Sequence, residues 1–120
     1  MSVILVAEDE ALIMMNIVDD LIEAGYDVLE ARHAEEALNI LGAVADGIHI
    51  LFTDVRMPGA MDGIALCHHT KKHWPWIGLL ATSAHPAPSA DELPEGCRFL
   101  SKPYHRAHVI EHLAALKGAG

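Results

Sequence analysis

Short apolar runs alternate with amphipathic stretches along nearly the whole chain. The runs are typical of strands in a parallel sheet, whereas apolar residues every three or four positions indicate helices with one buried face. We expect strands at residues 3–7, 27–31, 48–54, 77–82 and 98–101, and helices at residues 11–24, 33–41, 62–73 and from Pro103 onward. This alternation predicts one α/β domain whose parallel sheet is covered by helices on both faces.

The first predicted helix carries more apolar residues than one core face needs. The residues expected to face the core are Leu12, Met15, Val18, Leu21 and Ile22. Ile13, Met14 and Ile17 fall outside this stripe. We therefore predict an exposed apolar patch in which Met14 and Ile17 form a partner surface. The alternative is that these residues are buried against the last helix.

The segment between the fourth and fifth strands interrupts the alternation. Residues 84–96 contain three prolines, which leave room for about one helical turn. The sequence therefore predicts a shortened or irregular fourth helix.

Composition restricts the possible classes of protein. The 120 residues suffice for one domain, and 52% hydrophobic content with a mean hydropathy of +0.24 excludes a disordered chain. The net charge of -9 argues against binding to nucleic acid or to an anionic membrane. Cys67 and Cys97 are far apart in sequence, and we expect two free thiols in a reducing compartment. Without an apolar membrane span or a secretion signal, the sequence predicts a cytoplasmic protein.

Acidic side chains end two of the predicted strands. Glu8 and Asp9 follow the first strand, and Asp54 ends the third. Because parallel strands present their carboxyl ends at one edge of the sheet, we expect these acids to lie together. Carboxylates suit Mg²⁺, with Mn²⁺ as an alternative, whereas zinc fits poorly without a thiolate. Acids at strand ends are also common as turn and helix-cap residues, which is the alternative for any one of them.

Polar residues that can bind a phosphoryl group end the fourth and fifth strands. Thr82 and Ser83 follow the fourth strand, and Lys102 follows the fifth. A lysine can neutralise a phosphoryl oxygen and a hydroxyl can donate to another. Together with the acids, these groups predict a phosphoryl-transfer site in which Asp54 is the nucleophile.

The same residues belong to five short motifs that occur in order along the chain. The motifs are Glu8-Asp9-Glu10, residues 52–59 around Asp54, Met61-Asp62-Gly63, Thr82-Ser83-Ala84 and residues 99–104. In order and spacing they resemble the receiver domain of response regulators in two-component signalling, from Val3 to about Leu116. The resemblance implies a flavodoxin-like sheet with strand order 2-1-3-4-5. It also implies that residues 1–120 form one receiver domain, of the stand-alone kind.

The resemblance implies a role for each acidic residue of the site. Asp54 would accept a phosphoryl group from a sensor histidine kinase or a histidine phosphotransfer protein. Asp9 and Asp54 would bind Mg²⁺ through their carboxylates, Glu8 mainly through water, and Arg56 through its backbone carbonyl. Glu8 stands where many relatives have Asp, and its longer side chain favours the water-mediated contact.

The resemblance also implies how the phosphoryl group is held and sensed. Lys102 would pair with Asp54 and then with the phosphoryl group. Ser83 would donate to a phosphoryl oxygen and shift the following loop; we prefer it to Thr82 because a small residue follows it. Phe99 occupies the aromatic switch position but lacks a hydroxyl, so only its packing could change. Pro103 would follow Lys102 through a cis peptide.

The leading prediction is a signalling domain that is phosphorylated on Asp54 and turns over no conventional substrate. One alternative is a receiver-like binding module that is never phosphorylated. Another is an aspartyl-phosphate phosphatase of the haloacid-dehalogenase type, but Asp54-Val55-Arg56 lacks the second acid of its Asp-x-Asp motif. The nine histidines provide no evident zinc-ligand set. The sequence names neither the kinase nor the downstream target.

Overall fold

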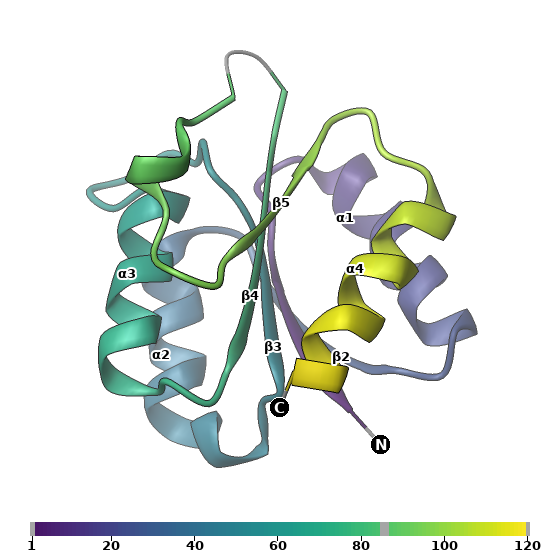
Figure 1. The fold of residues 1–120 in the computed structure, drawn as a ribbon, viewed down its shortest axis with the longest axis horizontal. Coiled ribbons are helices and arrows are strands. Elements are labelled where there is room, and N and C mark those ends of the chain that lie inside the picture. Colours follow the sequence, from purple (N-terminus) through teal and green to yellow (C-terminus); the bar gives the residue numbers. More distant parts are fainter. Residues whose placement is uncertain (1, 85–86, 120) are drawn as a thin grey trace.

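The computed structural model describes residues 2–84 and 87–119, which form a parallel sheet between two helical layers (Figure 1). The strands are β1 (Val3–Ala7), β2 (Asp27–Ala31), β3 (Ile50–Asp54), β4 (Gly78–Ser83) and β5 (Arg98–Ser101). The helices are α1 (Ala11–Glu23), α2 (Ala34–Val44), α3 (Gly63–His73) and α4 (Arg106–Ala119), with 3-10 turns η1 (Ala45–Gly47) and η2 (Ala90–Glu92). The strand order β2-β1-β3-β4-β5 confirms the predicted flavodoxin-like fold.

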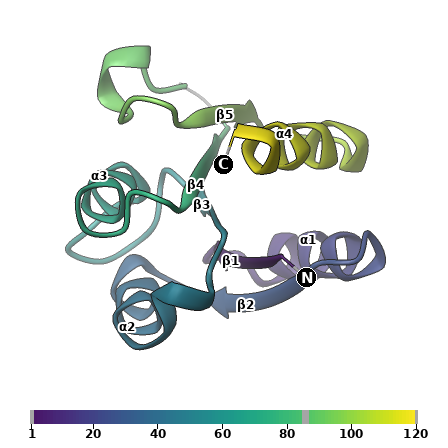
Figure 2. The same ribbon diagram turned by 60° about the horizontal axis from the view of Figure 1, so that its bottom comes forward.

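Each face of the sheet has its own hydrophobic core. Helices α2 and α3 cover one face, and α1 and α4 cover the other (Figure 2). Alternation along β3 sends Leu51 into the first core, and Ile50 and Phe52 into the second. The central strands are therefore buried on both sides, which is why they read as continuous apolar runs.

The observed ends of most strands and helices lie within three residues of the predicted ends. The last helix is an example of such a difference. We expected this helix to begin at Pro103, but α4 begins at Arg106. The intervening residues form a connection in which the Tyr104 ring packs against Phe52, with ring centroids 5.8 Å apart. The helix thus begins only after this packed connection.

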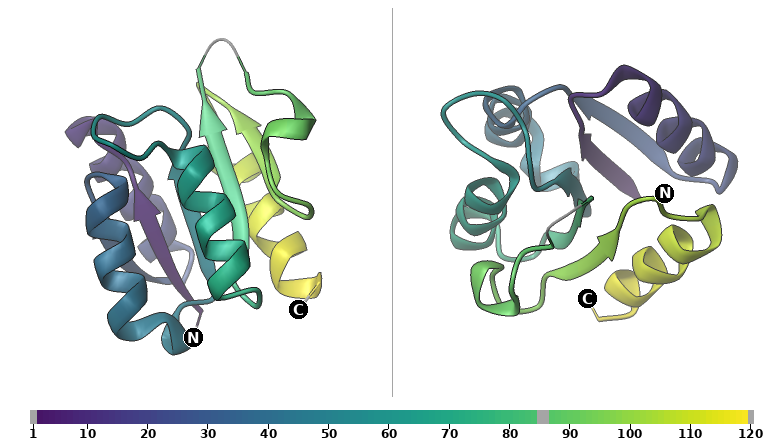
Figure 3. Two further views of the ribbon diagram at one scale, coloured as in Figure 1. Left: turned by 90° about the vertical axis from the view of Figure 1, so that its left-hand side faces the viewer. Right: turned by 90° about the horizontal axis from the view of Figure 1, so that it is seen from above.

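The fourth helix is reduced to η2, as the prolines predicted. The chain after β4 passes over α3 before it returns as β5 (Figures 1 and 3). His68 on α3 anchors this segment, since its Nε2 lies 2.8 Å from the backbone oxygen of Glu92. Residues 85–86 of the predicted irregular segment lie outside the described residues.

Asp62 and Gly63 fix the start of α3 directly beside the end of β3. The Asp62 side chain caps the helix by accepting a hydrogen bond from the Ala65 amide at 2.9 Å. The Gly63 amide donates to the carbonyl of Val55 at 2.8 Å. A Cβ atom at position 63 would collide with the backbone carbonyl of Asp54. Glycine therefore allows the helix to pack this closely to the candidate phosphoacceptor.

Candidate functional site

Three carboxylates meet at the carboxyl edge of the sheet. Glu8 and Asp9 directly follow β1, and Asp54 ends β3, which pairs with β1. One oxygen from each residue lies within 4.8 Å of the others. Glu8 and Asp54 are buried, whereas Asp9 is exposed. The described residues hold no second group of three or more possible metal ligands, so the histidine-rich helices present no such cluster.

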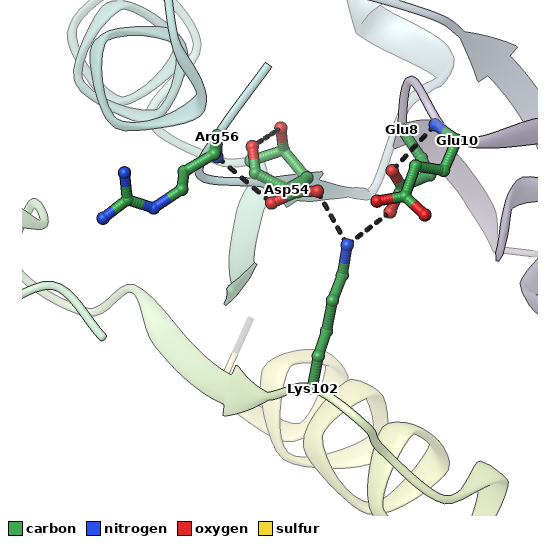
Figure 4. Close-up of polar contacts among 6 residues, drawn as sticks. Glu8, Glu10, Asp54, Arg56 and Lys102 are labelled. Carbon is green, nitrogen blue, oxygen red and sulfur yellow. Dashed lines mark hydrogen bonds and ion pairs between the residues drawn. The ribbon is translucent and has the colours of Figure 1, made fainter. Parts of the chain in front are cut away.

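Lys102 connects the two buried carboxylates. Its Nζ donates to Asp54 Oδ2 at 2.7 Å and to Glu8 Oε1 at 3.0 Å (Figure 4). Burial by itself would lower the pKa of Lys102, but the hydrogen bonds to Asp54 and Glu8 outweigh it and raise the pKa above its ordinary value. The lysine is therefore a fixed positive charge between two acids.

Glu8 is the acid whose charge is most disfavoured by its surroundings. Burial raises its pKa, against the opposing effect of the Glu10 amide and Lys102, and the charge of Asp54 raises it further. The Glu10 amide donates to Glu8 Oε2 at 3.1 Å. A cation bound between the acids would relieve this unfavourable ionisation.

Asp54 is held by contacts on both carboxylate oxygens. The backbone amide of Arg56 donates to Asp54 Oδ1 at 3.1 Å, opposite the oxygen that Lys102 contacts. The Arg56 side chain is exposed and extends away from the carboxylates (Figure 4). The backbone amide of Arg56 thus faces the site, whereas the predicted metal contact of its backbone carbonyl stays a prediction.

Thr82 and Ser83 are both buried, and within the part of the chain that the structure describes neither hydroxyl has a hydrogen-bond partner. Thr82 pairs with Asp54 in the register of β3 and β4, so both side chains project from the same face of the sheet. Thr82 also lines a small cavity together with Glu8 and Asp54. Ser83 is one residue further along the strand, on the face that carries Ala81. Thr82, rather than the Ser83 preferred from the sequence, is therefore the hydroxyl residue on the sheet face of Asp54.

Phe99 and Pro103 lie on either side of Lys102 along the chain. Phe99 is half-buried, is paired with Ala81 in the register of β4 and β5, and packs against the core beneath α2 and α3. The Lys102–Pro103 peptide is cis, as predicted. Phe99 and Lys102 thus lie on opposite faces of the sheet.

Two features of the site were missed at the level of sequence. Tyr104 lines the small cavity beside Asp54, and burial together with the charge of Glu8 raises its pKa to about 12. A cleft of about 600 Å³ also opens beside Asp9, and Pro88 and Glu92 form part of its wall. The irregular segment before β5 therefore borders the site. Its composition predicted irregularity but not this position.

The predicted partner surface on α1 is wrong. Met14 and Ile17 are 6% and 2% exposed, because this stripe of the helix packs against the sheet. The large exposed apolar residues of α1 are instead Leu12, Met15 and Ile22, at 74%, 58% and 57%. Both stripes have helical spacing, so the sequence pattern alone did not show which stripe faces the sheet. We expected Leu12, Met15 and Ile22 to face the core, and Met14 and Ile17 to be exposed.

Fold and site together define a receiver domain. Residues 4–114 match the family described as the response regulator receiver domain, and the chain belongs to this family. A solved response regulator receiver protein from Sinorhizobium medicae has a TM-score of 0.92 at 26% identity, covering 98% of this chain and 95% of that one. A solved response regulator receiver domain protein from Clostridium thermocellum has a TM-score of 0.90 at 27% identity, covering 99% of this chain and 96% of that one.

Two curated relatives place receiver sequences of this kind inside longer proteins. An uncharacterized transcriptional regulatory protein of Bacillus subtilis, YrkP, is 33% identical over 93% of this chain and 48% of its own length. The sensor kinase CckA of Brucella abortus is 34% identical over 86% of this chain and 11% of its own length. The chain thus spans less than half of the length of either relative.

None of the helices in the described residues is both long and apolar enough to cross a membrane.

Proposed function

We propose that Asp54 accepts a phosphoryl group from a phosphohistidine on a sensor kinase or phosphotransfer protein. The observation that carries this proposal is the contact of Asp54 with Lys102, at 2.7 Å, beside Glu8 and Asp9. A buried carboxylate that is oriented on both oxygens is prepared for attack on phosphorus. The family adds support, because receiver domains are the phosphorylatable modules of two-component systems.

The proposed transfer needs one bond exchange. A carboxylate oxygen of Asp54 attacks phosphorus, an O–P bond forms, the P–N bond of the phosphohistidine breaks, and the imidazole leaves with the electron pair. The added group brings negative charge to a site that already contains Glu8 and Asp9. Lys102 would transfer one of its hydrogen bonds from Asp54 to a phosphoryl oxygen and so offset part of that charge.

We propose that Glu8, Asp9 and Asp54 bind Mg²⁺, with Mn²⁺ as a possible substitute. The donors are carboxylates whose oxygens lie within 4.8 Å of one another, and such hard oxygen ligands suit these ions. The backbone carbonyl of Arg56 would supply a further oxygen. When bound, the ion would neutralise charge on the phosphoryl oxygens.

We propose Thr82 as the hydroxyl that donates to a phosphoryl oxygen. Its side chain is buried, projects from the sheet face of Asp54 and has no partner among the described residues. Ser83 projects from the opposite face of the sheet, which also carries Phe99, and would respond to a shift of the end of β4. A Phe at position 99 can change only its packing, since it has no hydroxyl to donate.

We propose that the donor protein docks on the exposed stripe of α1. Leu12, Met15 and Ile22 recur at helical spacing on the outer face, and Leu12 lies in the first turn of the helix, directly after the acidic cluster. Leu12 thus lies at the end of α1 that is nearest the acidic cluster, and Met15 and Ile22 continue the apolar surface along the helix for a partner that must place its histidine next to Asp54.

Intact mass after incubation with Mg²⁺ and acetyl phosphate or phosphoramidate tests the proposal. We expect a single phosphoryl adduct in the wild type and none in Asp54→Asn. The mass of an Asp46→Asn variant, which alters an exposed acid in η1, should still increase.

The two competing functions predict different results. A binding module that is never phosphorylated would give no adduct with either donor. A phosphatase would release phosphate steadily from diverse monoesters, with activity that depends on Asp54.

A further inference from the structure

The two cysteines of the chain lie together in the fold although they are distant in sequence. Cys67 is on α3 and is completely buried, whereas Cys97 directly precedes β5 and is partly exposed. Both belong to the core beneath α2 and α3, and the two thiols lie close enough that each shifts the pKa of the other, while Cys97 Sγ donates to the Arg98 carbonyl at 3.4 Å. A contact between two thiols from separate elements is the arrangement that a disulfide requires.

Independent contacts hold the segment of Cys97 against α3. His68, next to Cys67, binds the backbone oxygen of Glu92 at 2.8 Å. One turn further, Lys71 Nζ lies 3.9 Å from the position that a Cβ on Gly96 would occupy. Gly96 has a φ of 84°, a left-handed conformation that suits glycine and reverses the chain just before Cys97. Residues 92–97 therefore lie along α3, which brings Cys97 into the same core as Cys67.

We propose that Cys67 and Cys97 form a reversible intramolecular disulfide when the protein meets a peroxide. This pair would be a second modification site, separate from Asp54 and independent of phosphorylation. Cys97 is the residue that the oxidant reaches, because it is partly exposed, and Cys67 is the buried partner that completes the bond.

The reaction proceeds in two balanced steps. The thiolate of Cys97 attacks one oxygen of hydrogen peroxide, and the O–O bond breaks to give a sulfenic acid and hydroxide. The sulfur of Cys67 then attacks the sulfur of this sulfenic acid, its proton is taken up by the departing hydroxide, and the S–S bond forms. Two thiols and one peroxide thus become one disulfide and two waters.

The ionisation of the pair agrees with these roles. The nearby thiol of Cys67 lowers the pKa of Cys97, against the effect of burial, so Cys97 is the better nucleophile. The nearby thiol of Cys97 and complete burial raise the pKa of Cys67, which keeps it a thiol until its partner is oxidised.

The bond would tie α3 to the start of β5. Gly63 begins α3 against the carbonyl of Asp54, and Phe99 follows Cys97 by two positions on β5. Oxidation would therefore restrain two elements that border the phosphoacceptor. Closing the loop between the cysteines also lowers the entropy of the unfolded chain and should raise the melting temperature by about 5–15 °C.

Intact mass and free-thiol counts after treatment with stoichiometric hydrogen peroxide test the proposal. We expect the wild type to lose both thiols together, with a mass decrease of about 2 Da that dithiothreitol reverses. The melting temperature should rise in the oxidised sample. Asp54→Asn should behave identically, which separates this result from the proposed phosphorylation.

Two variants assign the roles of the cysteines. Cys67→Ala should retain a peroxide-sensitive Cys97 that gains oxygen or links two chains. Cys97→Ser should leave a buried Cys67 that resists peroxide. The proposal is overturned if the wild type gains oxygen or dimerises without the decrease of about 2 Da.

Discussion

Lys102 is the residue on which the geometry of the site depends. It donates to Asp54 and Glu8 at 2.7 and 3.0 Å, and both acceptors are buried. Two buried carboxylates would otherwise repel each other. Because its pKa is raised by these partners, Lys102 stays charged wherever they are ionised. The sequence identified all three residues, since each stands at or just after the end of a strand in a recognisable motif.

The choice between Thr82 and Ser83 leads to a prediction at the scale of one hydroxyl. Thr82→Val keeps the side-chain shape but removes the donor, so we expect phosphorylation by acetyl phosphate to slow by about two- to tenfold. Folding stability should not fall, because the buried hydroxyl has no partner among the described residues. The rate is measured by intact mass against time.

Ser83→Ala is the matched control and should leave this rate unchanged. The opposite pattern, with a slow Ser83→Ala and a normal Thr82→Val, would return the donor role to Ser83.

At the scale of elements, α1 carries two apolar stripes, one buried and one exposed. Its buried stripe contains Met14 and Ile17, and its exposed stripe contains Leu12, Met15 and Ile22. One stripe belongs to the core on its side of the sheet, and the other faces solvent. The neighbouring positions Met14 and Met15 thus have opposite roles despite identical side chains.

This pair gives a prediction for the docking surface. Met15→Asp should slow phosphotransfer from a phosphohistidine donor protein while leaving phosphorylation by acetyl phosphate intact. Its stability should stay within about 0.5 kcal/mol of the wild type, because the side chain is 58% exposed. Both rates are followed by intact mass, and stability by urea unfolding.

Met14→Ala is the contrasting variant and should lower the free energy of unfolding by about 2–5 kcal/mol. Equal slowing with both donors in Met15→Asp would argue against docking on α1.

The start of α3 gives a second prediction at this scale. Gly63→Ala should lower the free energy of unfolding by about 1–3 kcal/mol, because the new Cβ meets the Asp54 carbonyl and the helix must shift. We also expect slower phosphorylation, since that shift displaces the end of β3. Chemical unfolding and the rate of adduct formation measure the two effects.

Gly42→Ala provides the control within α2. Open space surrounds the position of its Cβ, so this substitution should stabilise the helix by about 0.5–1 kcal/mol. A neutral Gly63→Ala would mean that α3 is free to move away from β3.

At the scale of the whole molecule, the acidic cluster adds to a net charge of -9. Three acids share one edge of the sheet, and Lys102 contacts two of them. Burial already disfavours the charge of Glu8. A divalent cation bound at this edge would therefore favour the folded state.

Magnesium should accordingly raise the melting temperature. At a concentration about ten times the dissociation constant, the stabilisation is about 1.4 kcal/mol. For a domain of this size that corresponds to roughly 5 °C, which thermal unfolding can resolve. Asp9→Asn should remove most of the effect, whereas Asp46→Asn should keep it. Potassium chloride at matched ionic strength is the reference, and an equal shift with that salt would contradict a specific site.

The sequence by itself determined the elements and most of the site. Apolar periodicity and turn chemistry are local, so they indicated the strands, the long helices and the reduced fourth helix. The placement of Asp54 and Lys102 at one edge followed from the parallel order of the strands. Tertiary structure alone decided which stripe of α1 is buried and whether Thr82 or Ser83 faces Asp54. It also decided that Cys97 lies in the same core as Cys67. These outcomes depend on the rotation of a helix, the register of a sheet and the path of a distant segment, and local periodicity fixes none of them.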